Sequence, residues 1–494
     1  MNVLMIYPEY PDTYWSFKHA LKFISKKAAV PPLGLITVSA MLPENWQRKL
    51  IDLNIEILQD SDIEWADFIF LSGMYVQKKS VIEILERCKN YPVTIIAGGP
   101  LFTQDYDNYP QIDHFILNEA EITMPVFLKD LKEANEKRIY RTNEFADLSF
   151  TPVPDYHLLK LKDYAFMNMQ ISRGCPFNCD FCEITALLGH KVRMKTSEQV
   201  TKELDTLYKL NWRGPIAVVD DNFIGNKQVV KNSILPDMIT WMETHNHPFK
   251  LNAQTSINLA DDKRMLELMR NAGFISTFIG IETPVEESLQ SCNKVQNENR
   301  DLLENVKQIQ EGGLQVSGGF IVGFDTDTET VFQQQVDFIQ KSGIVSAMVG
   351  LLNAPKNTLL YKKMEEEKRL TEDATGSNTD FTMNFAPKMN HQKLLDGYQF
   401  IINSIYMEKP YYQRIRALLR NYKPVNNGKA KLDMSRIKAF IRSIYVLGLA
   451  NKGRFEYWKL MFWTILYKPR LFIDAVTMAV YGYHFRVIYG LRSI

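Results

Sequence analysis

Cysteine is scarce in this chain: its 494 residues include only Cys88, Cys175, Cys179, Cys182 and Cys292. So few cysteines, in an odd number, exclude the disulfide framework of a small secreted protein. The first ten residues lack a basic segment followed by a long apolar run, so we expect no signal peptide. No stretch reaches about 18 uncharged apolar residues, so we also expect no membrane-spanning helix.

An excess of one charge is also missing. The chain has 58 Lys and Arg residues against 57 Asp and Glu residues, which gives a net charge of +1. This balance gives no reason to expect a nucleic-acid partner. Hydrophobic residues make up 46% of the chain and charged residues 23%, a composition that excludes disordered and collagen-like proteins. The length suits about three globular domains.

The N-terminal part alternates short apolar runs with helical patterns. Strands are expected at 3–7, 68–72, 94–97 and 114–117, and helices at 33–42 and 80–90. This alternation predicts an α/β domain with a doubly wound parallel sheet over residues 1–145. Ligands of such sheets bind beyond the carboxyl ends of the strands. Turns rich in glycine and proline follow several of these strands, although such residues also occur in βα turns that bind nothing.

A second α/β block follows over residues 146–365. Strands are expected at 166–171, 216–219, 249–252, 274–281, 314–322 and 346–351, with helical patterns between them. Six βα repeats predict a partial (β/α)6 barrel, whose C-terminal rim would carry the chemistry. The strand pattern fades after this block, and residues 366–494 are predicted to form a mostly helical domain.

Three cysteines stand directly after the first strand predicted in the second block. Cys175, Cys179 and Cys182 follow the spacing Cys-x3-Cys-x2-Cys. Three thiolates can hold three irons of a [4Fe–4S] cluster and leave the fourth iron open. An open position is what substrate-binding metal centres keep. The alternative is a zinc site completed by a ligand such as His190, although the second ligand pair usual in structural zinc sites is missing.

This motif resembles that of the radical S-adenosylmethionine (SAM) superfamily. The resemblance implies that SAM chelates the open iron, and that its one-electron cleavage yields a 5′-deoxyadenosyl radical that abstracts hydrogen. Residues 219–226, 278–284 and 318–325 resemble the SAM-binding segments of the superfamily, in the same order. The resemblance implies an aromatic packed on adenine, carboxylates facing the SAM amine, and groups near the ribose. The SAM-binding residues implied are Phe181, Asp220, Asp221, Asn222, Ser256, Gly280, Glu282 and Gly323.

The N-terminal domain resembles the cobalamin-binding domain found in one class of these enzymes. The cobalamin-binding residues implied are Pro32, Gly34, Ser72, Gly73, Met74, Gly98, Gly99, Glu119 and Glu121. An Asp-x-His-x-x-Gly motif is absent, so a histidine ligand to cobalt is not expected. A domain that has lost its cofactor is the alternative. Methylthiotransferases place three further cluster cysteines in this domain, where our chain has only Cys88.

Longer stretches resemble the subgroup of hopanoid methylases and tetraether-lipid ring synthases. These stretches are 182–185, 189–196, 220–226, 347–352 and 384–389. The resemblance implies functionalisation of an unactivated carbon, foremost C-methylation, of a lipid or other hydrophobic small molecule. A flavodoxin or ferredoxin would supply the low-potential electron. Radical C–C bond or ring formation, and a non-catalytic cobalamin or redox sensor, are the alternatives. No residue acting on the substrate can be named.

The C-terminal tail is basic and aromatic. Residues 434–494 contain ten basic residues and two acidic ones. The apolar residues Ile437, Phe440, Ile441, Ile444 and Leu447 share one helical face. A basic amphipathic helix of this kind can lie in a membrane interface. We therefore expect a cytoplasmic protein with peripheral contact at the inner face of the membrane, unless the apolar stripe packs on the barrel.

Overall fold

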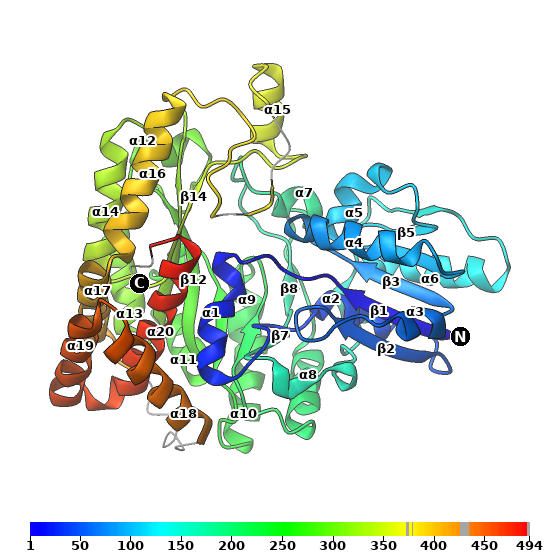
Figure 1. Ribbon diagram of the computed structural model, residues 1–494, viewed down its shortest axis with the longest axis horizontal. Coiled ribbons are helices and arrows are strands. Elements are labelled where there is room, and N and C mark those ends of the chain that lie inside the picture. Colours follow the sequence, from blue (N-terminus) through cyan, green and yellow to red (C-terminus); the bar gives the residue numbers. More distant parts are fainter. Residues whose placement is uncertain (372–374, 378, 425–433, 492–494) are drawn as a thin grey trace.

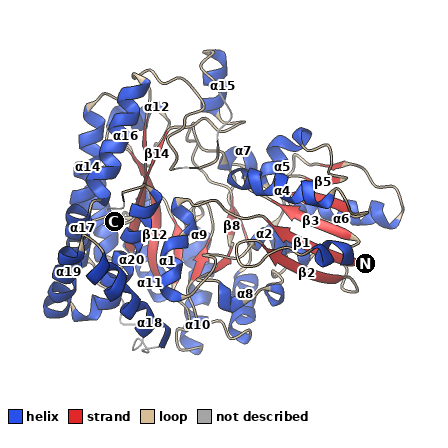
Figure 2. Ribbon diagram, viewed as in Figure 1, coloured by secondary structure: helices blue, strands red, loops and turns tan. Residues whose placement is uncertain are grey.

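Two parallel sheets of six strands each dominate the computed structural model, which describes residues 1–371, 375–377, 379–424 and 434–491. The two α/β units lie side by side, and the helices of the C-terminal third pack on the second unit (Figure 1). Figure 2 shows strands at the centre of each unit and helices on their outer faces. The predicted fold class, with its N-terminal α/β sheet, partial barrel and helical C-terminal part, is confirmed.

The first sheet has the order β2-β1-β3-β4-β5-β6 and is parallel throughout. Its strands are β1 (Asn2–Tyr7), β2 (Gln47–Asp52), β3 (Phe68–Ser72), β4 (Thr94–Gly98), β5 (His114–Ile116) and β6 (Ile139–Tyr140). Its helices are α2 (Leu33–Ser39), α3 (Asp60–Trp65), α4 (Lys78–Cys88), α5 (Pro100–Asp105) and α6 (Ala120–Lys132). Short 3-10 turns are η3 (Tyr75–Gln77) and η4 (Tyr106–Asn108). From β1 the chain continues to β2 on one side of the sheet and then to β3 on the other side. Such a reversal of strand order creates a ligand crevice at the carboxyl ends of the two strands where it occurs, here β1 and β3.

The two edge strands of this sheet were not predicted. Strand β2 begins with the polar residues Gln47, Arg48 and Lys49, and only its last three residues are buried. Strand β6 has two residues, of which one is exposed. Edge strands bury less apolar surface than central ones, so the apolar run that marks a buried strand is too short in both.

Residues 8–31 leave the first sheet and cross to the other unit (Figure 1). They form η1 (Tyr14–Ser16), α1 (Lys18–Leu21) and η2 (Lys22–Ile24). Tyr14 stacks on Phe485 of the last helix with ring centroids 4.5 Å apart. Further on, Ala28 pairs with Tyr164 in a parallel bridge. This N-terminal segment therefore packs with the barrel unit, which a domain boundary drawn at residue 145 does not anticipate.

The second sheet has the order β14-β13-β12-β11-β10-β7, also parallel throughout. Its strands are β7 (Met167–Met169), β10 (Ile216–Val218), β11 (Leu251–Gln254), β12 (Phe274–Glu282), β13 (Gln315–Val322) and β14 (Ala347–Leu351). Between residues 1 and 371, the first and last strands do not pair, so the barrel is open. All six strands expected from the sequence are present, and each buries apolar residues.

Helices alternate with these strands. They are α8 (Ser197–Lys209), α9 (Lys227–Val229), α10 (Leu235–Thr244), α11 (Lys263–Asn271), α12 (Glu286–Ser291), α13 (Leu302–Glu311), α14 (Thr330–Ser342) and α15 (Leu359–Glu366). A π-helical turn, η8 (Val230–Ile234), and a 3-10 turn, η9 (Ile257–Leu259), interrupt the pattern. Three more 3-10 turns precede the barrel: η5 (Leu148–Phe150), η6 (Tyr156–Leu158) and η7 (Leu161–Asp163).

The C-terminal part is helical, as predicted. Its elements are α16 (His391–Tyr406), α17 (Glu408–Asn421), α18 (Met434–Ser443), the π-helical η10 (Ile444–Ala450), α19 (Arg454–Tyr467), η11 (Pro469–Leu471) and α20 (Phe472–Ile488). By length and composition alone, one stretch of the described chain, Pro469–Ile488, could span a membrane. Half of it is buried inside the protein, where the Arg486 guanidinium lies 5.6 Å from the Tyr411 ring centre. It therefore packs as a core helix.

Two arginine–glutamate pairs join the units. Arg173 donates two hydrogen bonds to Glu121, at 3.0 and 2.8 Å, and Arg193 donates two to Glu119, both at 2.6 Å. No side chain of the four is more than 14% exposed. Bidentate pairs of this kind fix orientation as well as distance. They hold the start of α6 against the antiparallel ribbon β8 (Ser172–Arg173) and β9 (Arg193–Met194).

Replacing Glu119 by alanine tests this junction. The change leaves Arg193 buried without its partner, and we expect the free energy of unfolding to fall by about 3–5 kcal/mol. Denaturant unfolding of the full chain measures it. Glu83→Ala is the matched control, because its pair with Lys79 is exposed and 4.0 Å long, and we expect a loss below about 1 kcal/mol. Equal losses in the two variants would contradict a stabilising role for the junction.

Candidate active site

The three clustered cysteines lie on one loop between β8 and the short helix α7 (Ile184–Leu188). The Cys182 N–H donates to the Cys179 carbonyl at 3.1 Å, which turns the loop back on itself. Gly174 begins the loop with φ +91°, and a Cβ there would lie 2.8 Å from the Lys191 carbonyl oxygen. Only glycine permits both the left-handed conformation and this close approach. The loop therefore lies tightly against β9 and its preceding turn.

The cysteine loop is also tied to the segment after α12. The Asp180 N–H donates to the Cys292 carbonyl at 3.1 Å, and the Asn293 side chain donates to the Asp180 carboxylate at 2.6 Å. The Gln296 amide lies 3.6 Å from the Cys179 sulfur, within reach of a hydrogen bond. Segment 292–297 thus forms one wall of the cysteine site, a role that no sequence motif indicated.

The donor set suits an iron–sulfur cube better than a single zinc ion. Within the described residues, no three His, Cys, Asp or Glu side chains converge on one metal position. A cube needs no such convergence, because each thiolate binds a different iron. His190, the fourth ligand considered for zinc, is exposed. The zinc alternative is therefore not supported.

Lys294 is a buried cation that the sequence analysis missed. Its Nζ lies 2.6 Å from Glu282 Oε1 and 5.8 Å from the centre of the Phe181 ring. Burial alone would lower the pKa of Lys294, but the charges of Glu282 and Cys179 raise it above its usual value. Gly280 makes room for this pair, since a Cβ there would lie 2.2 Å from the Glu282 carboxylate. Lys294 therefore stays protonated beside the cysteines, with its charge paired to Glu282.

That positive charge matters because the cysteines are sheltered from water. Burial raises the pKa of Cys182 to about 12, with a further increase from Cys179. Burial likewise raises the pKa of Cys175. Thiolates in this position need cations close by, which bound iron and Lys294 would both supply.

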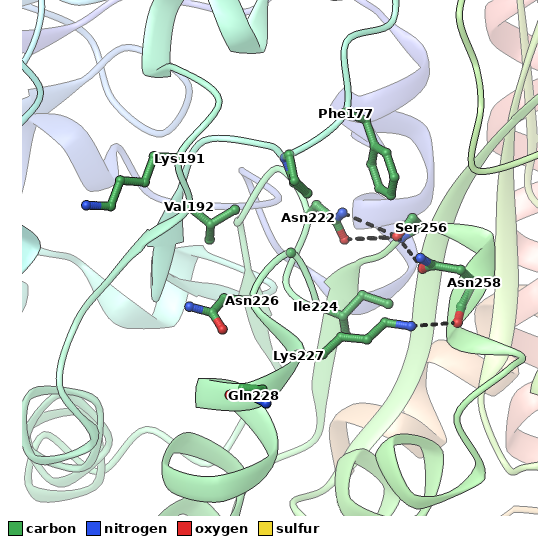
Figure 3. A pocket seen from close by; sticks show the side chains of 12 residues that line it. Phe177, Lys191, Val192, Asn222, Ile224, Asn226, Lys227, Gln228, Ser256 and Asn258 are labelled. Carbon is green, nitrogen blue, oxygen red and sulfur yellow. Dashed lines mark hydrogen bonds between the residues drawn. The ribbon is translucent and has the colours of Figure 1, made fainter.

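The strand ends bring together most of the predicted SAM-binding residues. Asn222, Ser256, Gly280, Glu282 and Gly323 follow or end four successive parallel strands, β10 to β13, and so lie at one rim. Asn222 Nδ2 donates to Ser256 Oγ at 3.3 Å, and the Ser256 N–H donates to Asn222 Oδ1 at 3.2 Å (Figure 3). Phe181 meets the Phe324 ring edge-on, with centroids 6.2 Å apart. These contacts place the residues as expected, and their contact with SAM stays a prediction.

An open cavity of about 610 Å³ adjoins the cysteine loop (Figure 3). Polar and apolar residues together line it: Pro176, Phe177, Lys191, Val192, Asn222, Ile224, Gly225, Asn226, Lys227, Gln228, Ser256 and Asn258. The Lys227 ammonium donates to the Asn258 carbonyl at 3.0 Å across one side of the cavity. Amides and ammonium groups of this kind suit a polar ligand.

The two adjacent aspartates have different environments, and for Asp220 the expectation needs correction. Asp220 is fully buried and accepts hydrogen bonds from the Ile171 N–H at 2.7 Å and from Ser172 Oγ at 2.5 Å. Both oxygens are used, so Asp220 supports the cysteine loop from behind and does not face a SAM amine. Asp221 Oδ2 has no hydrogen-bond partner in the described structure. It remains an available acceptor.

The predicted cobalamin-binding turns lie at the carboxyl edge of the first sheet. Ser72, Gly73 and Met74 end or follow β3, and Gly98 and Gly99 end or follow β4. Residue 32 precedes α2, and residue 34, which lies in its first turn, is exposed. Apart from Met74, the residues after β3 and β4 have small side chains, and the contact of this edge with cobalamin stays a prediction.

Glu119 and Glu121 do not have the role in cobalamin binding that the sequence predicts for them. Their carboxylates are taken up by Arg193 and Arg173 at the domain junction. Side-chain contacts from either glutamate to a corrin would require breaking a buried ion pair, which is costly. They are therefore better described as residues that join the two units.

Family models and relatives agree with this geometry. Residues 24–128 match the B12 binding domain, residues 169–339 the radical SAM superfamily, and residues 358–491 a domain of unknown function, DUF4070. An uncharacterized methyltransferase of Synechocystis sp. is 36% identical over 98% of this chain and 91% of its own length. The hopanoid C-2 methylase of Rhodopseudomonas palustris is 30% identical over 93% of this chain and 88% of its own. The chain is a cobalamin-binding radical SAM enzyme.

Solved structures show the same fold. The radical SAM methyltransferase TsrM of Kitasatospora setae, with cobalamin and a [4Fe–4S] cluster bound, covers 91% of this chain and 95% of its own. Its TM-score is 0.62 at 14% sequence identity. The enzyme family uses a [4Fe–4S] cluster, SAM and cobalamin, which confirms the cofactors expected from the sequence.

Alanine at each motif cysteine tests the cluster site. We expect Cys175→Ala, Cys179→Ala and Cys182→Ala to abolish formation of an intact cluster, because three thiolates are the minimum set here. Anaerobic reconstitution followed by iron analysis and electron paramagnetic resonance measures this. Cys88→Ala is the control, since Cys88 packs in the first unit on α4.

Cys292→Ala tests whether the fourth iron is open. Burial raises the pKa of the Cys292 thiol to about 12, and its sulfur lies 3.4 Å from the Leu289 carbonyl as a hydrogen-bond donor. We therefore expect a neutral thiol and about four irons per chain in the variant, as in the wild type. Loss of iron in Cys292→Ala would mean that a fourth cysteine closes the site to SAM.

Asp220 predicts a pH dependence of stability. Burial raises the pKa of Asp220 to about 7, above its ordinary value of 3.8. The folded protein therefore binds an extra proton between these values, and its stability falls by a few kcal/mol as pH rises from about 4 to about 7. Asp220→Asn removes this contribution. Unfolding of the cofactor-free wild type and variant across that range should show a flatter profile for the variant, and parallel profiles would contradict the assignment.

Proposed function

We propose that this enzyme methylates an unactivated carbon of a lipid or another hydrophobic small molecule. The named relatives support C-methylation, since the hopanoid C-2 methylase of Rhodopseudomonas palustris matches nearly the whole chain. The Synechocystis relative is also named a methyltransferase. A low-potential one-electron donor of the flavodoxin or ferredoxin type would supply the reducing equivalents.

The observation that carries the proposal is the junction of the two units. Arg173 lies two residues before Cys175 on the loop that would bind the cluster. Its partner Glu121 lies in the first turn of α6, directly after β5 and its turn. The ion pair thus fixes the cysteine loop to the ligand-binding edge of the first sheet. Bound cobalamin supplies a transferable methyl group, and the cluster with SAM supplies a radical that abstracts hydrogen.

Several side chains near this junction suit such chemistry. Lys294 offers a cation for the carboxylate of a ligand beside the thiolates, and Asp221 offers an acceptor for its amine. An apolar cluster that contains Phe324, Leu352 and Phe385 packs against Phe181. Apolar walls exclude water, which would otherwise react with a radical intermediate.

The test uses SAM labelled in its methyl group. The reconstituted enzyme is incubated anaerobically with hydroxocobalamin, a reductant and lipid extracts, and the products are analysed by mass spectrometry. We expect label in a lipid product together with 5′-deoxyadenosine, and loss of both in Cys179→Ala. Cys88→Ala should retain both.

Other results would point to other functions. Formation of 5′-deoxyadenosine without label in the product would support ring or C–C bond formation. Failure of the reduced wild-type enzyme to cleave SAM, with its cluster intact, would overturn the enzymatic assignment and favour a sensor.

A further inference from the structure

Exposed apolar side chains gather on the helices at the C-terminal end. They lie on α18, η10 and α19, and each is more than half exposed. They are Ile441, Tyr445, Leu449, Phe455, Phe462, Ile465, Leu466 and Tyr467, and we call them the C-terminal surface. Single exposed apolar residues are common, but a group of this size on adjoining helices indicates an interaction site.

The exposed apolar side chains recur at helical spacing, so they form continuous faces of the helices. Ile441, Tyr445 and Leu449 repeat every four residues along α18 and η10. On the opposite sides of these helices, Leu447 and Leu460 are buried. The Trp458 indole donates to the Gly448 carbonyl at 2.9 Å and holds α19 beside η10. The helices are thus packed on one side and apolar on the other.

The apolar stripe predicted from the sequence is divided between these two sides. Leu447 is buried, and Phe440 and Ile444 are partly buried. Phe440 meets Phe472 with ring centroids 5.3 Å apart. Ile437 and Ile441 remain exposed. Packing against the protein therefore accounts for three of the five stripe residues and leaves Ile437 and Ile441 exposed in the described structure.

Basic side chains lie on the same helices and on the turns beside them. Those that are exposed are Lys438, Arg442, Lys452, Arg454, Lys459 and Arg470. Lys459 stands between Phe455 and Phe462 along α19. The acidic side chain on this helix, Glu456, lies near Arg416 at 3.9 Å and Lys459 at 4.0 Å. The surface therefore combines apolar groups with an excess of positive charge.

We propose that the C-terminal surface binds the headgroup and upper acyl region of an anionic lipid bilayer. Phe455, Phe462 and Leu466 would enter the acyl boundary, and tyrosines such as Tyr445 suit the headgroup level. Lysine and arginine side chains around them would meet anionic headgroups. A second copy of the chain fits less well, because a two-fold contact places the same basic patch against itself.

This inference goes beyond the proposed function and needs none of its cofactors. Figure 1 shows α18 and α19 at the end of the molecule away from α7, which follows the cysteine loop. Binding at this surface would therefore hold the enzyme at the bilayer without covering the cysteine loop. Vesicle binding and methyl transfer can fail separately.

The test is flotation of the reconstituted full-length enzyme with vesicles. One set contains phosphatidylcholine alone, and the other contains phosphatidylcholine mixed with phosphatidylglycerol. We expect partition to be at least about tenfold stronger with the anionic vesicles and to weaken as salt is added. Wild-type enzyme that stays unbound to both would overturn the proposal.

A triple variant identifies the surface. Phe455→Ser, Phe462→Ser and Leu466→Ser together should lower partition at least about tenfold, because their burial in the acyl region is lost. The matched control is Ile57→Ser with Phe150→Ser, whose side chains are 77% and 81% exposed elsewhere. Equal partition of the triple variant and wild type would overturn the proposal. So would a wild-type dimer that the triple variant dissociates without any vesicle binding, since that result assigns the surface to a second copy.

Discussion

The buried ion pairs between the two α/β units are the constraint on which the functional arrangement depends. Each unit alone offers a ligand-binding edge at the carboxyl ends of parallel strands. What brings the edges together is the pairing of Arg173 with Glu121 and of Arg193 with Glu119. Burying four charges is unfavourable unless each is fully paired, so these contacts permit little variation in the angle between the units. The junction therefore gives the two units a defined relative geometry.

The same principle operates inside the cysteine site. Buried thiolates are unfavourable without nearby cations, and Lys294 provides a fixed one. Glu282 in turn neutralises part of that lysine and keeps it in place. Positive charge near a cluster favours its reduced state and the binding of an anionic ligand group. The electrostatics of the site are thus set by residues from β12 and the segment after α12, which lie more than 90 residues from the cysteine motif.

Much of this arrangement could be predicted from the sequence. The residues whose roles could not be predicted, Lys294 and Asp220, owe those roles to tertiary contacts. The barrel strands contain buried apolar residues, and the spacing of Cys175, Cys179 and Cys182 is visible directly. Lys294 carries no such signal, because an isolated lysine in a polar stretch is normally a surface residue. The sequence predicts the same role for Asp220 and Asp221, because spacing does not tell neighbouring aspartates apart. Only the tertiary contacts show that its carboxylate is used by Ile171 and Ser172.

The cavity beside the cysteine loop and the apolar cluster next to it offer different surroundings to a ligand. Lys191, Asn226 and Lys227 give the cavity amide and ammonium groups, and Phe177, Val192 and Ile224 add apolar ones. A ligand with both polar and apolar parts, such as SAM, suits this mixed lining. The cluster around Phe324 and Phe385 is apolar and packs against Phe181, which lies between the second and third cysteines of the motif. If the substrate is a lipid, this cluster offers its reacting carbon an apolar contact close to the cysteine loop.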